Sequence, residues 1–238
     1  MDYKEKVKQL EDNNYLISMV PVDELLRFGY EAGLCQSSRV LDLCCGYGTV
    51  LKVWSQAFGI CGVGVDLNAE FIEIGKKRLQ EAEVDTKIEL RCADVFEYQD
   101  ESPYDVVICS ETFGNIAKTF ALGERYLKKG GTLAFYKLYS KVPNPPKELV
   151  DFDEEVLPLP ELNRTFNELG YHLTCMASDS NGMWEHYVVN WSAKRDLHRL
   201  RQNPDDKALA QWMDKWYEMY FNYRRPYEGQ ALFGLERF

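Results

Sequence analysis

The sequence predicts an α/β fold with a doubly wound, mostly parallel sheet of seven strands and an inserted helical cap. The first observation is that short apolar runs alternate with longer amphipathic runs between residues 38 and 135. Strands and helices that alternate at this spacing form parallel strands joined by right-handed crossovers. The second observation is a glycine turn directly after the first apolar run. Because such sheets bind ligands beyond the carboxyl ends of their strands, we expect the functional site at that edge.

The individual elements follow from hydrophobic periodicity and from helix-stop residues. Strands are expected over residues 39–43, 62–66, 87–92, 104–109, 132–136, 171–176 and 231–235. Helices are expected over residues 49–57, 69–82, 162–169 and 205–224, and a further helix is expected to end at 122–127, before Gly130. Five prolines between residues 142 and 160 indicate a loop.

The composition is that of a folded, acidic protein. The 238 residues include 28 Lys and Arg against 38 Asp and Glu, so the formal net charge is −10. Nucleic acids and anionic membranes require a basic face, so neither is expected as a partner. The seven cysteines form no Cys-x-x-Cys pair and no cluster with histidine. This pattern favours a reducing cytoplasmic location and predicts no metal site.

We expect a single domain over the whole chain, because no linker is long enough to divide it. Its expected parts are an N-terminal helical segment (1–37), a core that contains the glycine turn (38–180), a helical aromatic cap (181–228) and a last strand (229–238). The cap is predicted from aromatic residues at three- and four-residue spacings, which are typical of an amphipathic helix.

The strongest local signal is the segment 42–48, Asp-Leu-Cys-Cys-Gly-Tyr-Gly, which joins a predicted strand to a predicted helix. Glycines allow the backbone to turn tightly and to approach a ligand, and the amides of a helix N-terminus bind a negative group. Asp66 ends the next strand, 20 residues after Gly46, where a carboxylate can accept hydrogen bonds from a ribose diol. Asp94 follows the third strand and is expected at the same edge.

A dinucleotide site is not expected, because Leu51 stands where the G-x-G-x-x-G pattern has its third glycine. The sequence instead resembles the class I S-adenosylmethionine-dependent methyltransferases, a family with a Rossmann-like fold. The similar segments are, in order, 42–48, 62–66, 93–95, 104–111 and 127–133. Residues 110–116 and 184–187 look similar to small bacterial members related to the quinone-biosynthesis methyltransferases.

The resemblance implies S-adenosylmethionine as the cofactor and suggests which residues bind its methionine end. Asp42 would hold the ammonium group, often through water. Gly46 and Gly48 would let the loop pass under the methionine and the ribose. Cys44 stands where the family usually has glycine, so its side chain is expected to narrow this end of the pocket.

The resemblance also implies which residues bind the rest of the cofactor. Asp66 would bind the ribose hydroxyls, and Leu67 would pack on the face of the adenine. Asp94 would accept a hydrogen bond from the adenine amino group, with the Val95 amide near the ring. Ser110, at the end of the fourth strand, would face the reactive methyl group.

Catalytic and acceptor-binding residues are expected at two places in the chain. Glu111 follows the fourth strand, and His186 and Tyr187 lie in the aromatic segment. Each could act as a general base, which methyl transfer needs only if the acceptor arrives protonated. Trp184 and Tyr187 are expected to line the acceptor pocket, since aromatic rings hold cations and flat rings.

The favoured function is in-line methyl transfer to a small-molecule acceptor. A protein methyltransferase and a non-catalytic S-adenosylmethionine-binding protein remain as alternatives. Adenine and amide N-methyltransferases mostly have Asn/Asp-Pro-Pro-Tyr/Phe after the fourth strand, whereas residues 110–113 are Ser-Glu-Thr-Phe. Both a monomer and a homodimer remain open.

Overall fold

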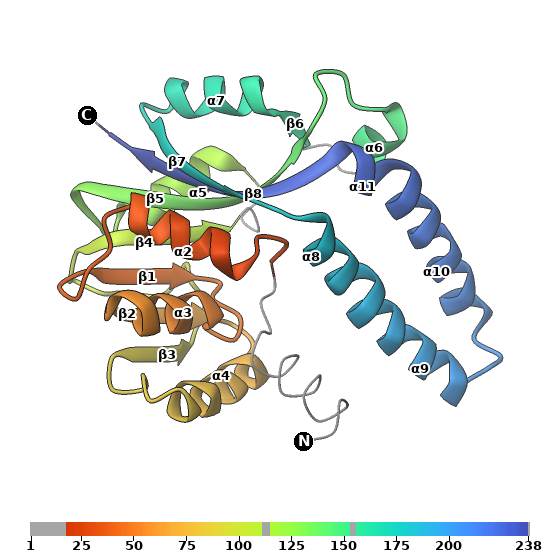
Figure 1. The fold of residues 1–238 in the computed structure, drawn as a ribbon, viewed down its shortest axis with the longest axis horizontal. Helices are drawn as coiled ribbons and strands as arrows, with labels where there is room; N and C mark the ends of the chain where they lie inside the picture. The colour runs from red at the N-terminus through yellow and green to blue at the C-terminus, as the bar shows by residue number, and fades with distance from the viewer. Residues whose placement is uncertain (1–17, 111–114, 153–155, 238) are drawn as a thin grey trace.

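The computed structural model describes residues 18–110, 115–152 and 156–237, which are built around one sheet (Figure 1). Seven strands follow the order β3-β2-β1-β4-β5-β8-β7, and the short β6 (Leu157–Pro158) pairs with β5 outside this order. These strands are β1 (Arg39–Leu43), β2 (Cys61–Asp66), β3 (Ile88–Cys92), β4 (Tyr104–Ser110), β5 (Leu127–Ser140), β7 (His172–Ser178) and β8 (Glu228–Glu236). Among these described strands, β8 alone runs in the direction opposite to the others, which confirms the predicted, mostly parallel sheet.

Helices cover both faces of the sheet, as the doubly wound prediction requires. The helices of one face are α2 (Val22–Glu31), α3 (Thr49–Phe58) and α4 (Ala69–Glu81), and those of the other are α5 (Ile116–Glu124) and α7 (Leu159–Glu168). Successive side chains of a strand point to opposite faces. Accordingly, Val40 of β1 belongs to the core that contains Trp54 of α3, whereas the adjacent Leu41 belongs to the core that contains Phe120 of α5.

Two predicted boundaries were wrong. The helix expected to end at 122–127 ends at Glu124, because Leu127 already pairs with Tyr104 as the first residue of β5. Gly130, predicted as the helix stop, lies within β5 at φ +75°, in a stretch where the register with β4 shifts.

The proline-rich segment is also more regular than the predicted loop. It contains α6 (Lys147–Phe152), and α7 begins at Leu159 rather than at 162. Pro160 lies in the first turn of α7, where its missing N–H costs no helical hydrogen bond.

A helical hairpin is inserted between β7 and β8, at the position predicted for the cap. Its first arm consists of α8 (Asn181–Glu185), a π-helical stretch (His186–Ala193) and α9 (Lys194–Gln202). Its second arm consists of α10 (Lys207–Met219), a shorter π-helical stretch (Tyr220–Arg224) and α11 (Arg225–Tyr227). The hairpin stands away from the sheet, on the side toward which β1 and β3 point (Figure 1). Within the described ranges, no helix has the length and apolar character needed to cross a bilayer.

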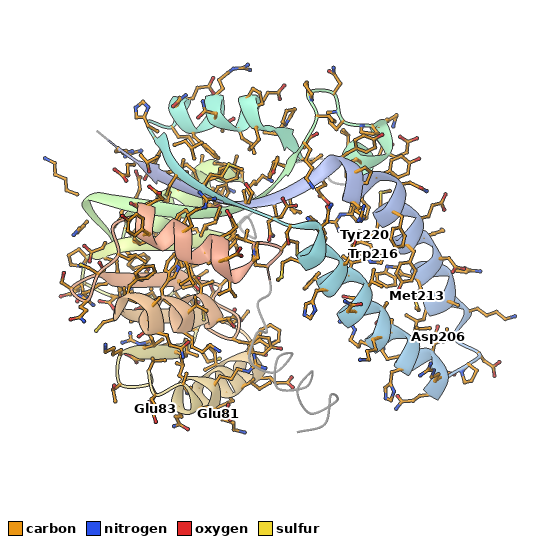
Figure 2. All side chains as sticks on the ribbon, in the orientation of Figure 1. Glu81, Glu83, Asp206, Met213, Trp216 and Tyr220 are labelled. Atoms are coloured by element: carbon orange, nitrogen blue, oxygen red, sulfur yellow. The ribbon has the colours of Figure 1, made fainter. Side chains whose placement is uncertain are left out.

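Aromatic residues surround Arg224 at the base of the hairpin. The Arg224 guanidinium carbon lies 5.3 Å from the ring centre of Trp184, 5.0 Å from that of Trp216 and 5.2 Å from that of Phe152. The same guanidinium forms a buried ion pair with Glu228, the first residue of β8. In Figure 2, Tyr220 of the second π-helical stretch and then Trp216 and Met213 of α10 follow one another from the base of the hairpin toward its tip. The hairpin is therefore anchored where the sheet resumes.

Candidate functional site

The loops that follow β1, β2 and β3 lie side by side at one edge of the sheet. Leu43 pairs with Val65, and Asp66 pairs with Cys92, so these strands end at neighbouring positions. The backbone N–H groups of Cys44 and Cys45 donate to the Val65 carbonyl oxygen at 2.8 and 3.1 Å. The structure therefore brings together the glycine loop, the Asp66 segment and the Asp94 segment.

The glycine loop follows a left-handed path that only small side chains adopt readily. Cys44, Gly46 and Gly48 have φ angles of +67°, +55° and +68°. Gly48 also caps α3, and a Cβ atom there would lie 2.8 Å from Leu90 Cδ2. Cys44 holds the left-handed conformation with a side chain, which costs about 1–2 kcal/mol in an L-residue. That conformation explains why glycine suits the position.

Asp66 holds the loop and the start of the next helix together. One carboxylate oxygen, Oδ2, accepts the Gly46 N–H at 2.8 Å, and the other, Oδ1, accepts the Asn68 N–H at 2.9 Å. Asn68 in turn caps α4 by accepting from the N–H groups of Glu70 and Phe71. Each carboxylate oxygen has further acceptor capacity. Asn68 was missed in the sequence reading, although an Asn just before an apolar-periodic run is a helix-cap signal.

Asp42 lies beneath this loop and is buried. Burial, with a further contribution from the carboxylate of Asp66, raises the pKa of Asp42 from 3.8 to about 7. Burial likewise raises the pKa of the Cys45 and Cys109 thiols, which are near Asp42. A cation placed beside Asp42 would favour its ionised form.

The residues predicted to contact the adenine lie near Asp66, which is predicted to bind the ribose. Leu67 is 72% exposed, an unusual position for a large apolar side chain beside a buried strand. Asp94 is half-buried, and its Oδ1 accepts the Phe96 N–H at 2.8 Å. Val95 is buried, whereas the adjacent Phe96 is exposed. This edge therefore offers both carboxylates and open apolar surface.

The acceptor-side residues lie in two places. Ser110 ends β4 and pairs with Tyr136 of β5, so it shares the edge with the residues above. Glu111 lies outside the described residues. His186 and Tyr187 are half-buried in the π-helical stretch of the hairpin. Trp184 is fully buried at the hairpin base, where its indole N–H donates to Asp179.

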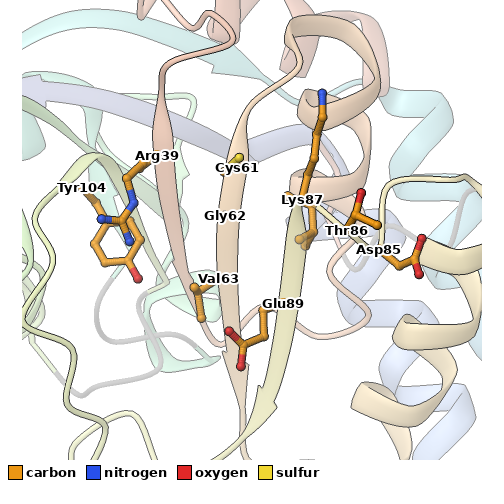
Figure 3. Close-up of a pocket in the computed structure, with 10 residues that line it drawn as sticks. Arg39, Cys61, Gly62, Val63, Asp85, Thr86, Lys87, Glu89 and Tyr104 are labelled. Atoms are coloured by element: carbon orange, nitrogen blue, oxygen red, sulfur yellow. The ribbon is translucent and has the colours of Figure 1, made fainter.

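A separate pocket lies at the opposite edge of the sheet. Figure 3 shows Arg39, Cys61 and Tyr104, the first residues of β1, β2 and β4, in its wall. Its volume is about 240 Å³, and the Arg39 guanidinium carbon lies 4.9 Å from the ring centre of Tyr104. Because it lines the amino ends of the strands, it is separate from the glycine loop. Among the described residues, no group of three or more His, Cys, Asp or Glu is arranged to hold a metal ion.

Comparison with known proteins finds a family match over the part of the chain that holds this site. Residues 40–131 match the family of methyltransferase domains. Over 210 residues, the chain is 28% identical to the uncharacterized protein YjhP of Escherichia coli K12, covering 83% of this chain and 84% of that protein.

Two crystal structures with S-adenosyl-L-homocysteine bound are similar to this fold. They are S-adenosylmethionine-dependent methyltransferases from Geobacter sulfurreducens and Thiobacillus denitrificans, each 26% identical with a TM-score of 0.83. The first match covers 96% of both chains and the second covers 100% of both. Together, these similarities support a class I S-adenosylmethionine-dependent methyltransferase that uses S-adenosylmethionine as its cofactor.

Proposed function

We propose that the protein transfers the methyl group of S-adenosylmethionine to a small-molecule acceptor, and that Asp66 is the central cofactor-binding residue. The observation that carries this proposal is the double hydrogen bond of the Asp66 carboxylate to Gly46 and Asn68. These two bonds fix a carboxylate that can accept further hydrogen bonds at the tip of β2, beside the exposed Leu67. A ribose diol can donate to such a carboxylate, and an adenine ring can cover such an apolar side chain.

The methionine end fits the residues beneath the loop. Asp42 is a buried carboxyl with a raised pKa, so an ammonium group beside it would be stabilised electrostatically. Gly46 and Gly48 have no side chains that would occupy the space beside the loop. Cys44 is half-buried and would narrow the space around the methionine.

The adenine end would use Asp94 and Val95. Asp94 holds its own loop through the Phe96 N–H and keeps acceptor capacity for an amino group. Val95 supplies a backbone amide in the same turn, and its side chain is buried in the core.

Bound S-adenosylmethionine supplies a methyl group that is already activated by the sulfonium charge. The chain therefore has to align the acceptor and exclude water. Ser110 lies at the end of β4, where it would contribute to this alignment, and the hairpin stands on the same side of the sheet (Figure 1). His186, Tyr187 and Glu111 are the candidates for a base, and Trp184 would support the hairpin wall from beneath.

A small acceptor is favoured over a protein for two reasons. Residues 110–113 lack the Asn/Asp-Pro-Pro-Tyr/Phe motif of amide N-methyltransferases. The hairpin stands on the side of the sheet where the strands end (Figure 1), and a site bordered by it would suit a small molecule better than a protein side chain. Kinship with the quinone-biosynthesis subgroup, proposed from residues 110–116 and 184–187, points the same way.

The test is calorimetric titration with S-adenosylhomocysteine. Asp66→Ala should weaken binding tenfold or more, which is about 1.4 kcal/mol. Asp85→Ala is the matched control, because Asp85 is exposed in the wall of the pocket at the opposite edge. Unchanged affinity in Asp66→Ala would contradict the cofactor assignment. Formation of S-adenosylhomocysteine with metabolite fractions, but not with protein fractions, would support the small acceptor.

A further inference from the structure

Lys137 of β5 is buried, with only 2% of its surface exposed. Lysine is among the residues that are least often fully buried. Phe135 and Tyr139, two positions before and after it on the strand, belong to the core beneath α5 and α7. Because side chains alternate along a strand, Lys137 lies on this same face. The charged side chain of Lys137 therefore lies in an otherwise apolar layer near the carboxyl end of β5.

A cavity of about 420 Å³ has Lys137 in its wall. The other lining residues come from the start of α5, from β6 and from the last turn of α7 (Asn115, Ile116, Ala117, Leu157, Thr165, Glu168 and Leu169). The volume lies within the range of pockets that hold small organic molecules. Most of the exposed lining is hydrocarbon, so an apolar ligand body would fit it.

Two positive features lie in the wall of the cavity. The ammonium nitrogen of Lys137 is buried, and the N-terminal end of α5 adds the positive end of a helix dipole. The negative residue of the lining, Glu168, is exposed, so water screens its charge. Lys137 also interacts with other groups of the protein, so an anion would join an existing set of contacts.

The cavity lies near the end of β4, where the methyl acceptor is expected. Ser110 pairs with Tyr136, and Lys137 is the next residue of β5. Asn115, which caps α5, lies only five residues after Ser110 and lines the cavity. Because side chains alternate along a strand, Lys137 lies on the opposite face from Tyr136, so the cavity and the Ser110 end of β4 are neighbours across the same edge of the sheet.

We propose that this cavity is the acceptor site and that Lys137 binds a carboxylate of the acceptor, which is therefore a small apolar acid. This inference rests on the function proposed above and narrows its substrate class. Lys137 acts as a specificity residue: it binds the acid group, whereas the apolar walls bind the body of the molecule.

The test compares acids with their neutral amides on protein saturated with S-adenosylhomocysteine. Octanoate and benzoate serve as probes, octanamide and benzamide as their uncharged counterparts, and calorimetry measures binding. We expect at least one acid to bind at least tenfold more tightly than its amide. Lys137→Met should remove this preference. Lys129→Met, which removes an exposed lysine from the same strand, should retain it.

The proposal would be overturned if neither acid binds, if both acids bind no more tightly than their amides, or if the preference survives in Lys137→Met. The comparison on the unaltered protein decides the question even if Lys137→Met does not fold. The preceding titration with S-adenosylhomocysteine separates the two proposals. If the cofactor product fails to bind, the proposed function fails; if it binds and the acids do not, only the acceptor inference fails.

Discussion

Replacement of Asp42 by asparagine tests the electrostatics of the cofactor site. Asp42 is buried, and its pKa is raised from 3.8 to about 7 by burial and by the carboxylate of Asp66. The folded protein therefore binds a proton at Asp42 between pH 4 and pH 7 that the unfolded chain releases. Raising the pH through this window should cost stability in the ligand-free protein.

The size of the effect follows from the pKa displacement. A change from 3.8 to about 7 corresponds to about 4 kcal/mol, since each pKa unit is worth about 1.4 kcal/mol. This stabilisation is fully present below pH 4 and is lost as the pH rises to about 7. Asp42→Asn cannot ionise, so its stability should lack this component of the pH dependence.

The assay is urea unfolding of the ligand-free proteins at several pH values from 4 to 8. The difference in unfolding free energy between Asp42→Asn and the unaltered protein should grow in favour of the variant by up to about 4 kcal/mol across this range. Asp85→Asn, at an exposed position, controls for the loss of a carboxylate. Parallel pH profiles for Asp42→Asn and the unaltered protein would refute the reasoning.

Cofactor binding provides a second measurement of the ionisation of Asp42. If the methionine ammonium lies beside Asp42, binding should drive Asp42 to ionise and release a proton below pH 7. Calorimetry with S-adenosylhomocysteine at pH 6, in buffers of different ionisation enthalpy, should detect this proton in the unaltered protein and not in Asp42→Asn. Proton release that is identical in both proteins would place the ammonium elsewhere.

Two further predictions concern packing and can be read from unfolding curves. Gly33→Ala, at φ +69° with open space around it, should lose about 1–2 kcal/mol. Gly48→Ala has a similar φ of +68°, and its new methyl group would lie 2.8 Å from Leu90 Cδ2, so its unfolding free energy should fall by about 1–3 kcal/mol more than that of Gly33→Ala. Equal losses in the two variants would show that Leu90 moves aside. Arg224→Met removes the ion partner of the buried Glu228 and should cost about 3–5 kcal/mol in urea unfolding. Adding Glu228→Gln to this variant should recover part of the lost unfolding free energy. A double variant that is less stable than Arg224→Met alone would contradict the ion-pair account.

The order of the core elements could be predicted from the sequence because local patterns encode it. β1 was predicted at 39–43 and spans Arg39–Leu43, since a buried parallel strand is a short apolar run. Asp66 was also predicted correctly as the end of a strand at the edge. The end of α5 was not predictable, because pairing of Leu127 with Tyr104 decided it against the local helix-stop signal.

What the sequence determined by itself is the set of strands and turns, and with them the edge that carries Asp42, Asp66 and Asp94. Backbone preferences and side-chain periodicity act over a few residues, so they are visible in a single chain. Tertiary structure alone decided the raised pKa of Asp42, because burial depends on all the segments that cover it. It also decided that Lys137 lies in the wall of a cavity, because α5, β6 and α7 meet there from distant parts of the sequence.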